Sequence, residues 1–397
     1  MRVLFLAQRV PYPPNRGDKI TTWRLVERLG RAHTVRIVAF AHDEKDLAAA
    51  EQLREKGFPT SVVRYNDRRA KLGALPLLLS RTPLTLGVYG SSALQAEVER
   101  LAADSDLAYA YSSSMGAFLE RHVQLPRIMH FGELDSDKWR QYAEQSSFPM
   151  RQVYGREQRT LLEFERRVAR SFAANVVCTP LEQQVFERHI PGAPCTVLRN
   201  GVDLVHYAPT WEGRDPARIV FTGVMNYRPN AEGCVWFVRE ILPLVRREVP
   251  SATFAIVGSH PTPEVQRLAD VPGVEVTGFV DDTRTWLRRA SVSVAPLRIA
   301  RGIQNKVLEA MAMGLPVVGT TCATQRVEGV PGRDFRVQDE AEGFAREVVD
   351  LLRNPDRALA LGRAARGFVE ANYDWEVVFS PLDELVERSA RIPPRST

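Results

Sequence analysis

Residues 291–319 read SVSVAPLRIARGIQNKVLEAMAMGLPVVG and contain one complete strand–loop–helix–strand unit. The β-branched run Ser291–Ala295 predicts a buried strand, and the apolar spacing after the loop predicts a helix over Asn305–Met313. Gly314, with a proline two residues later, is typical of a helix end. The apolar run Pro316–Gly319 then predicts the next strand. This order of elements predicts a parallel pair of strands in an α/β sheet.

The same alternation extends in both directions from this unit and gives two series of predicted strands. The first series is Val3–Ala7, Val35–Phe40, Ser61–Arg64, Leu107–Tyr111, Arg127–Phe131, Asn175–Thr179 and Thr196–Leu198. The second is Arg218–Thr222, Thr253–Val257, Val274–Val276, Ser291–Ala295, Pro316–Gly319 and Phe335–Val337. Turn residues at 203–209 interrupt the pattern between the two series. We therefore predict two doubly wound parallel sheets, which bind ligands at the carboxyl ends of their strands.

The length and composition favour a two-domain globular protein, because 397 residues exceed one compact core. The four cysteines are scattered, without a C-x-x-C pair or a nearby histidine cluster, which favours reduced thiols over a disulfide frame or a zinc site. The opening residues MRVLFLA predict a first strand and not a signal peptide. No apolar run approaches the roughly 20 residues of a spanning helix. We expect a cytoplasmic protein.

The positive charge is concentrated near the N-terminus. The whole chain has a formal charge of +5, whereas residues 1–72 alone contain 15 Lys/Arg and 8 Asp/Glu, a net of +7. Such a region favours anionic lipid head groups, and thus contact with the inner face of the plasma membrane, or an anionic substrate. Nucleic acid is disfavoured, because no basic motif is interleaved with aromatic residues.

The loop before the predicted helix Asn305–Met313 has the features of a phosphate site. Free amide groups and the positive dipole end at a helix start attract anions. Gly302 permits close backbone approach, and Arg301 and Lys306 add formal positive charge. Glu309, one turn further along the same face, suits the paired hydroxyls of a ribose. The alternative is a basic surface loop followed by an ordinary helix that packs its apolar face into the core.

The segments Glu309–Ala312 and Gly314–Val318 resemble the donor-site motif of glycosyltransferase family 4, retaining enzymes of the GT-B fold. That fold has two Rossmann-like domains with a cleft between them. Three other segments resemble motifs of the family in the same order along the chain. They are Leu198–Asp203 (LRNGVD), Phe221–Asn230 (FTGVMNYRPN) and Val276–Val280 (VTGFV). The resemblance spans almost the whole chain.

Within the family, the chain is most similar to sugar transferases that accompany exosortase (PEP-CTERM) exopolysaccharide clusters. The segments that carry this similarity are Ala300–Lys306 and Asp135–Trp139. The resemblance implies an acceptor domain over residues 1–204 and a nucleotide-sugar donor domain over 205–375. It also implies a last helix at about 376–397, after Tyr373-Asp-Trp375, that packs back on the first domain.

The resemblance also implies roles for individual residues. Those implied for the chemistry, as catalytic groups, are Arg228, Lys306, Glu309 and His130. Those implied for donor binding are Gly17, Gly223, Asn226, Asn230, Gly278, Phe279, Val280, Arg301, Gly302, Ile303, Gln304 and Asn305. One position departs from the family pattern, which has a second glutamate eight residues before Glu309. Arg301 occupies that position here, which puts the identity of the sugar in doubt.

Several of these residues also have simpler interpretations. His130, at the end of a strand, is structural on local pattern alone, and only the resemblance assigns it to the transferred sugar. Asp18 is expected to cap a helix. Glu133 and Asp135 give only a weak indication of an acid–base pair, because Asp135-Ser136 also fits a helix N-cap. Asp281-Asp282 superficially resembles a metal-binding pair, but acidic residues are favoured at a helix start.

The segment 68–81, RRAKLGALPLLLSR, combines leucines with flanking cations. It fits a membrane-interface segment or a buried helix start with solvated arginines, and the second interpretation is slightly favoured.

We therefore expect a metal-independent hexosyltransferase that needs no cofactor and uses a UDP- or GDP-sugar. The acceptor would be a lipid-linked or polysaccharide glycan in cell-surface glycan synthesis, with retention of configuration. The alternatives are a sugar-nucleotide epimerase of the same fold and a non-catalytic nucleotide-sugar-binding scaffold. A nicotinamide-dependent enzyme is disfavoured, since no G-x-G-x-x-G follows either first strand.

Overall fold

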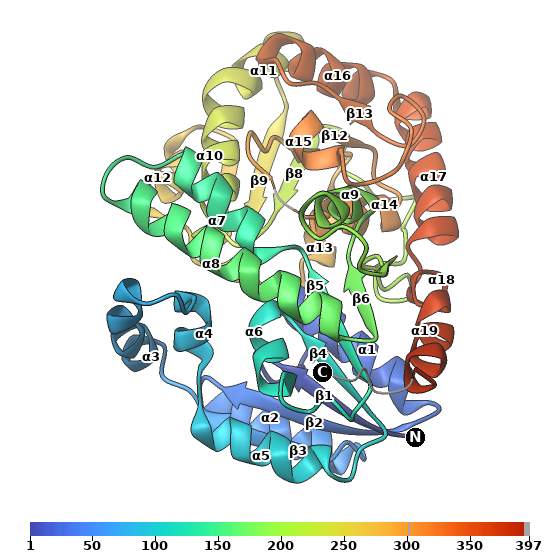
Figure 1. The fold of residues 1–397 in the computed structure, drawn as a ribbon. Coiled ribbons are helices and arrows are strands. Elements are labelled where there is room, and N and C mark those ends of the chain that lie inside the picture. The colour runs from blue at the N-terminus through green and yellow to red at the C-terminus, as the bar shows by residue number, and fades with distance from the viewer. Residues whose placement is uncertain (301, 393–397) are drawn as a thin grey trace. The chain divides into compact units, whose positions relative to one another are not determined.

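The computed structural model describes residues 1–300 and 302–392, and the chain forms two compact units (Figure 1). Unit 1 comprises Met1–Arg199 with Phe379–Thr397, and unit 2 comprises Asn200–Val378. The predicted boundaries at 204/205 and 375/376 lie a few residues from these.

Unit 1 is built on a parallel sheet in the order β3-β2-β1-β4-β5-β6-β7. Its strands are β1 (Arg2–Ala7), β2 (Thr34–Ala41), β3 (Thr60–Arg64), β4 (Leu107–Tyr111), β5 (Arg127–Gly132), β6 (Ala174–Val177) and β7 (Cys195–Val197). Its helices are α1 (Gly17–Gly30), α2 (Glu44–Glu55), α3 (Asp67–Ala74), η1 (Leu75–Leu79), α4 (Leu84–Tyr89), α5 (Ser92–Ala102), α6 (Ser113–Gly116), η2 (Ala117–Leu119), α7 (Asp135–Glu144), α8 (Met150–Ser171), α9 (Pro180–His189) and α19 (Ser380–Ala390). A hydrogen bond joins the C-terminal helix α19 to α1. The guanidinium of Arg28 on α1 donates to Asp383 Oδ2 on α19 over 2.6 Å.

Unit 2 is built on a second parallel sheet in the order β10-β9-β8-β11-β12-β13. Its strands are β8 (Arg218–Thr222), β9 (Thr253–Val257), β10 (Val274–Val276), β11 (Val292–Ala295), β12 (Val317–Gly319) and β13 (Arg336–Val337). Its helices are α10 (Arg228–Trp236), η3 (Phe237–Ile241), α11 (Leu242–Glu248), α12 (Pro263–Gln266), η4 (Arg267–Asp270), α13 (Arg284–Arg289), α14 (Asn305–Ala312), α15 (Thr321–Thr324), α16 (Ala341–Arg353), α17 (Pro355–Asn372) and α18 (Trp375–Val378). Both sheets are doubly wound, as predicted, and every predicted strand is present.

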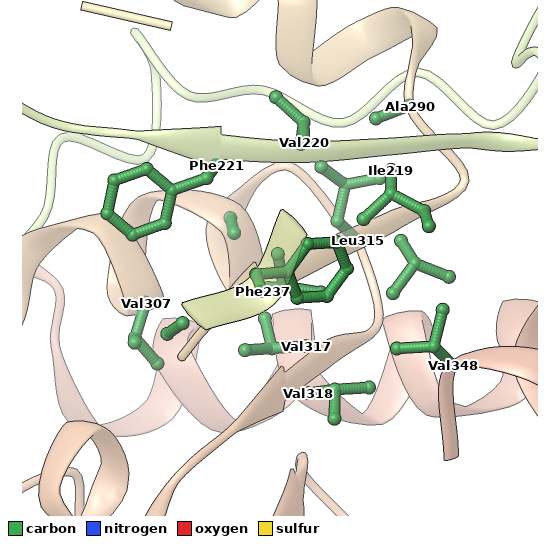
Figure 2. Close-up of a cluster of buried hydrophobic side chains, with 14 of the residues drawn as sticks. Ile219, Val220, Phe221, Phe237, Ala290, Val307, Leu315, Val317, Val318 and Val348 are labelled. Atoms are coloured by element: carbon green, nitrogen blue, oxygen red, sulfur yellow. The ribbon is translucent and has the colours of Figure 1, made fainter. Parts of the chain in front are cut away.

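The core of unit 2 fixes the position of α14 against the sheet. Phe221 on β8, Phe237 on η3 and Val307 on α14 are buried, together with Val317 and Val318 of β12 (Figure 2). Strands buried on both faces read as nearly continuous apolar runs, which is why the sequence pattern identified them. The same packing leaves the start of α14 at the carboxyl edge of the sheet.

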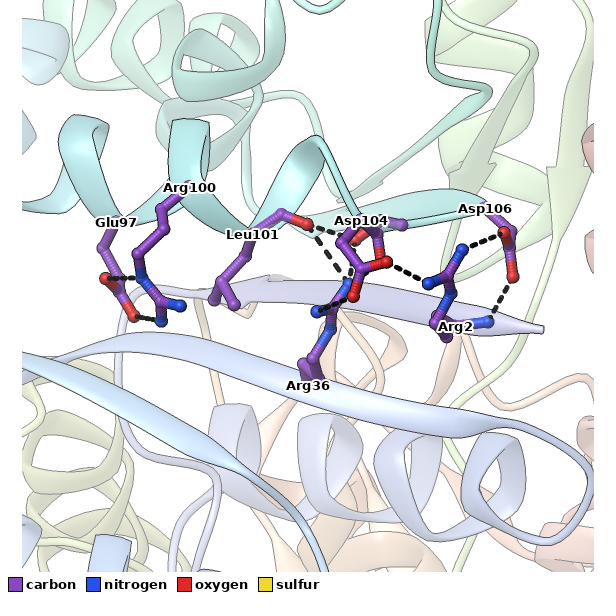
Figure 3. Close-up of polar contacts among 8 residues, drawn as sticks. Arg2, Arg36, Glu97, Arg100, Leu101, Asp104 and Asp106 are labelled. Atoms are coloured by element: carbon purple, nitrogen blue, oxygen red, sulfur yellow. Dashed lines mark hydrogen bonds and ion pairs between the residues drawn. The ribbon is translucent and has the colours of Figure 1, made fainter.

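Ion pairs lie along the amino edge of the unit 1 sheet (Figure 3). Arg2 pairs with Asp104 and Asp106, and Arg36 on β2 donates to Asp104 Oδ2 over 3.1 Å. These pairs are largely exposed, so each contributes little to the stability of the fold. They tie strands β1 and β2 to the turn before β4, at the edge opposite the predicted ligand site.

Three local predictions are wrong. Arg16, not Asp18, precedes the first turn of α1, and Asp18 lies inside that turn, paired with Arg16. Helix α7 begins at Asp135 itself, after Leu134, so Asp135-Ser136 is not its N-cap. The segment 68–81 is not a buried helix start, because Leu72, Leu75 and Leu79 are exposed and Ala74 is the one buried residue of α3.

Candidate functional site

The candidate site lies at the carboxyl edge of the unit 2 sheet, where the loops after β8 and β9 approach each other. The amide of Gly223 donates to Val257 O over 2.9 Å. A side chain on Gly258, at φ +148°, would lie 1.8 Å from Gly223 O. Only glycine permits this approach, which fixes the backbone beneath the site.

Lys306 is the central cation of this edge. Its Nζ donates to Asn230 Oδ1 and lies 4.6 Å from the centroid of the Phe221 ring. Asn230 is buried and donates through Nδ2 to Val224 O over 2.9 Å. A Cβ on Gly223 would lie 2.7 Å from Asn230 Nδ2 and 3.2 Å from Lys306 Nζ. The structure therefore brings together three predicted residues, from the loop after β8, from α10 and from α14.

The surroundings of Lys306 disfavour the charged form of its side chain. Burial lowers the pKa of Lys306 from 10.5 to about 8, although the ammonium still carries most of its charge at neutral pH. An anion bound beside Nζ would favour the charged form and raise this pKa again. A desolvated lysine with an amide as its hydrogen-bond partner is therefore suited to hold phosphate.

Glu309 lies one turn along α14 and is held by a residue that the sequence analysis missed. The hydroxyl of Tyr207 donates to the Glu309 carboxylate and also interacts with Thr283. Burial raises the pKa of Glu309, while Tyr207 and the charge of Lys306 oppose this rise. The only sequence signal for Tyr207 was its position four residues after Asp203 of the Asn-Gly-Val-Asp motif.

The loop that leads into α14 contains a glycine in a left-handed conformation. Gly302 has φ +61°, a left-handed conformation that favours glycine. Ile303 is buried, Gln304 precedes the helix without forming a side-chain cap, and Asn305 begins it. Among the described residues, Asn305 Oδ1 is buried without a hydrogen-bond partner. Arg301 lies outside the described residues.

The turn after β10 presents an aromatic ring at the same edge of the sheet. Gly278 has φ +69°, and Thr277 Oγ1 donates to its carbonyl over 2.9 Å. Phe279 follows with 75% of its surface exposed, and Val280 is half-buried. An exposed ring beside the β9 loop suits stacking on a base, and this role stays a prediction.

Two further predicted residues lie at the start of α10 or just before it. Arg228 has a 77% exposed side chain, and its Nε donates to Glu232 Oε1 over 2.6 Å. Asn226 is exposed in the preceding loop. The predicted roles of both stay open.

In unit 1, the predicted residues lie at the carboxyl ends of β1 and β5. Gly17 is exposed and is the first residue of α1. His130 is 1% exposed on β5, and its Nδ1 lies 2.8 Å from the Tyr109 hydroxyl. Burial lowers the pKa of His130 to about 3, so the ring is neutral at physiological pH. This environment favours the structural interpretation, and sugar contact stays a prediction.

A buried carboxyl group on α8 was missed by the sequence analysis. Glu165 on α8 accepts from Ser113 Oγ over 3.0 Å and from the amide and hydroxyl of Ser136. Burial, together with the charge of Asp135, raises the pKa of Glu165 to about 8. The group is therefore mostly protonated at neutral pH. Its sequence context, a glutamate in an amphipathic helix, carries no sign of this burial.

The described residues contain no group of three or more His, Cys, Asp or Glu side chains arranged to hold a metal ion. Asp282 of the predicted acidic pair is engaged by Arg284, whose Nε and NH2 donate to it over 2.8 Å each. In the part of the chain that the structure describes, no helix combines the length and the apolarity needed to span a bilayer.

Residues 216–354 match the family model described as "Glycosyl transferases group 1". The chain is 28% identical to a phosphatidyl-myo-inositol mannosyltransferase of Propionibacterium freudenreichii, over 55% of this chain and 58% of that protein. It is 32% identical to a GDP-mannose-dependent alpha-(1-6)-phosphatidylinositol monomannoside mannosyltransferase of Mycolicibacterium smegmatis, over 51% of this chain and 59% of that protein. The chain thus spans less than two thirds of the length of these curated relatives.

Solved structures are similar over nearly the whole chain. Sucrose-phosphate synthase from Thermosynechococcus elongatus superposes with a TM-score of 0.71 at 17% identity, covering 98% of each chain. HepE of Anabaena in complex with UDP and glucose superposes with a TM-score of 0.70 at 15% identity, covering 98% of this chain and 99% of that one. The chain therefore has the GT-B fold, and its residues 216–354 match the group 1 glycosyl transferase family.

Proposed function

We propose that this protein is a glycosyltransferase that transfers a sugar from a nucleotide-diphosphate donor. The observation that carries the proposal is the contact of Lys306 with Asn230 above Gly223, one helical turn from Glu309. These residues all lie within the segment that matches the group 1 glycosyl transferases.

The proposed chemistry is the exchange of one bond at the anomeric carbon for another. The bond from that carbon to the diphosphate oxygen breaks, and a bond to the acceptor hydroxyl oxygen forms on the same face, with retention. The acceptor proton passes to the departing diphosphate. Lys306 and the first amides of α14 stabilise the charge that develops on that group. Glu309, oriented by Tyr207, holds the ribose and so positions the donor.

Neither a divalent ion nor a further cofactor has a role in this proposal. Because the leaving diphosphate is neutralised by Lys306 and by backbone amides, we expect chelators to leave the activity unchanged. Arg228, Arg301 and His130 enter the proposal as predicted contacts of the donor.

The donor is a UDP- or GDP-sugar, and the acceptor is a lipid-linked or polysaccharide glycan. The M. smegmatis relative is named as GDP-mannose-dependent, and the Anabaena structure contains UDP. Both relatives named as mannosyltransferases act on phosphatidylinositol-based substrates by their names, which supports a lipid-linked acceptor. We propose a cytoplasmic site of action, in synthesis of a cell-surface glycan such as an exopolysaccharide.

A panel of UDP- and GDP-sugars, screened by thermal shift and then by transfer to lipid-linked acceptors, tests the proposal. A true donor stabilises the fold by mass action, by about 2.7 kcal/mol at 100 times its Kd. The anomeric configuration of the product, measured by NMR, tests retention. Release of free nucleotide and isomerised sugar without acceptor would identify an epimerase instead. Donor binding without turnover on any acceptor would identify a non-catalytic scaffold.

A further inference from the structure

An exposed apolar segment protrudes from unit 1 at α3 and η1. In Figure 1, α3 and α4 stand apart from the sheet of unit 1. Leu72 on α3 is 67% exposed, and Leu75 and Leu79 of η1 are 53% and 97% exposed. Single exposed leucines are common, but three within eight residues are not explained by the core of unit 1.

The segment is held in place by two adjacent residues of α8. The Arg156 guanidinium donates to three backbone carbonyls, those of Leu77, Ser80 and Thr82, the last over 2.9 Å. Glu157 is 1% exposed and accepts from the amides of Leu84 and Thr85 over 2.7 and 2.8 Å at the start of α4. Because the end of η1 and the start of α4 are both bonded to a long helix, the leucines are displayed on a fixed backbone.

Cations surround these leucines. Arg68, Arg69, Lys71 and Arg81 are all exposed. The only acidic residue in 67–81 is Asp67, which lies 2.6 Å from Lys71 Nζ. The net charge of 67–81 is therefore +3, from four cations and one carboxylate. A short apolar face flanked by Lys and Arg is typical of a segment that lies in a membrane interface.

We propose that the α3–η1 surface, defined as Arg68, Arg69, Leu72, Leu75, Leu79 and Arg81, docks on a bilayer that contains anionic lipids. The cations meet the lipid phosphates, and the leucines enter the boundary of the acyl chains. A soluble polyanion would satisfy the arginines but leave the leucines in water, so a lipid surface fits both. This proposal goes beyond the proposed function and does not depend on donor binding.

Vesicle flotation of the full chain tests the proposal. We expect binding to vesicles of phosphatidylcholine mixed with phosphatidylglycerol and little binding to phosphatidylcholine alone. Each basic residue near the surface contributes about 1 kcal/mol, or about fivefold in partitioning, and salt screens this term. Binding to the mixed vesicles should therefore fall steeply as salt is raised.

Two variants separate the apolar and cationic contributions. The triple variant Leu72→Ser, Leu75→Ser and Leu79→Ser should reduce partitioning at least about tenfold, and Arg68→Gln with Arg69→Gln and Arg81→Gln should do the same. The matched control replaces three exposed apolar residues elsewhere, Leu181→Ser, Val205→Ser and Val330→Ser, and should bind as the natural chain does. All substituted positions lie at the surface, so circular dichroism should show native folding.

The proposal is overturned if the natural chain does not float with anionic vesicles, or if the serine variant floats equally well. Loss of binding in the arginine variant alone would also overturn it, because the surface would then be an electrostatic site for a soluble polyanion. The assay contains no nucleotide sugar. Its result is therefore independent of whether the chain binds a donor, and failure of either proposal leaves the other standing.

Discussion

The two sheets share one architecture, but buried ionisable groups packed beside them differ in charge. At the edge of unit 2, Lys306 carries a positive charge beside Asn230 and the start of α14. In unit 1, His130 and Glu165 are buried and mostly neutral at physiological pH, because burial lowers the pKa of the histidine to about 3 and raises that of the carboxyl group to about 8. One fold thus supports a cationic site in one unit and buried, mostly neutral groups in the other. The predictions below test that contrast.

Loss of the Lys306 charge should have the largest effect on the rate of sugar transfer. Lys306→Ala removes the cation that we assign to the leaving diphosphate, and turnover should fall by about 10²–10³ or more. The matched control is Lys138→Ala in unit 1, at a partly exposed lysine whose Nζ lies 3.8 Å from Asp135 Oδ1. This variant should leave turnover nearly unchanged. Initial rates with the identified donor check both. Near-normal transfer by the Lys306 variant would remove the phosphate assignment.

A methyl group at Gly223 should weaken the site without removing a charge. In Gly223→Ala, the added Cβ would lie 2.7 Å from Asn230 Nδ2, so the Asn230–Lys306 pair must shift. We expect donor affinity to fall about tenfold, equivalent to about 1.4 kcal/mol. Gly367→Ala on α17 is the control, since a Cβ there meets nothing within 4 Å. Calorimetric titration with the donor measures the affinity of both variants. Equal affinities would show that donor binding does not depend on the absence of a side chain at Gly223.

Tyr207→Phe should weaken donor binding less than Gly223→Ala does. The hydroxyl that it removes lowers the pKa of Glu309, so this pKa should rise in the variant. The carboxylate stays in place but loses the hydrogen bond that orients it, and we expect a several-fold rise in donor KM that is larger at acidic pH. The pH profile of kcat/KM measures this shift. An unchanged profile would mean that Tyr207 does not orient Glu309.

The buried carboxyl group of Glu165 in unit 1 should affect stability more than activity. The folded pKa of Glu165 is raised above its unfolded value, so the folded state binds the extra proton between roughly pH 4.5 and 8. Stability should therefore fall as pH rises through this window, by at most about 1.4 kcal/mol per unit. Glu165→Gln should remove that dependence, which urea unfolding at several pH values would reveal. Parallel curves for both proteins would show that Glu165 titrates normally.

The fold was readable from sequence because buried parallel strands are continuous apolar runs, as at Arg218–Thr222 and Thr253–Val257, where both ends were predicted. The start of α14 was also predicted, since Gly302 and the helix-forming run after it are local signals. Helix caps were less accurate, because Arg16 precedes α1 without a capping side chain.

Residues that act through distant contacts could not be predicted from local sequence. The contact of Tyr207 with Glu309 joins positions about a hundred residues apart, and the burial of Glu165 depends on Ser113 and Ser136. The exposure of Leu79 depends on bonds from Arg156, and nothing in the leucine run distinguishes it from a core segment. The family resemblance supplied the candidate roles, whereas the geometry supplied the contacts.

The most direct test of the central claim is the binding of nucleoside diphosphates and monophosphates to the natural chain and to Lys306→Ala. Calorimetry should show UDP or GDP binding at least about tenfold tighter than the matching monophosphate, because the second phosphate meets Lys306 and the start of α14. This difference should vanish in the variant. Equal affinity for the two nucleotides, or an undiminished difference after Lys306→Ala, would contradict a diphosphate site at this edge of the sheet.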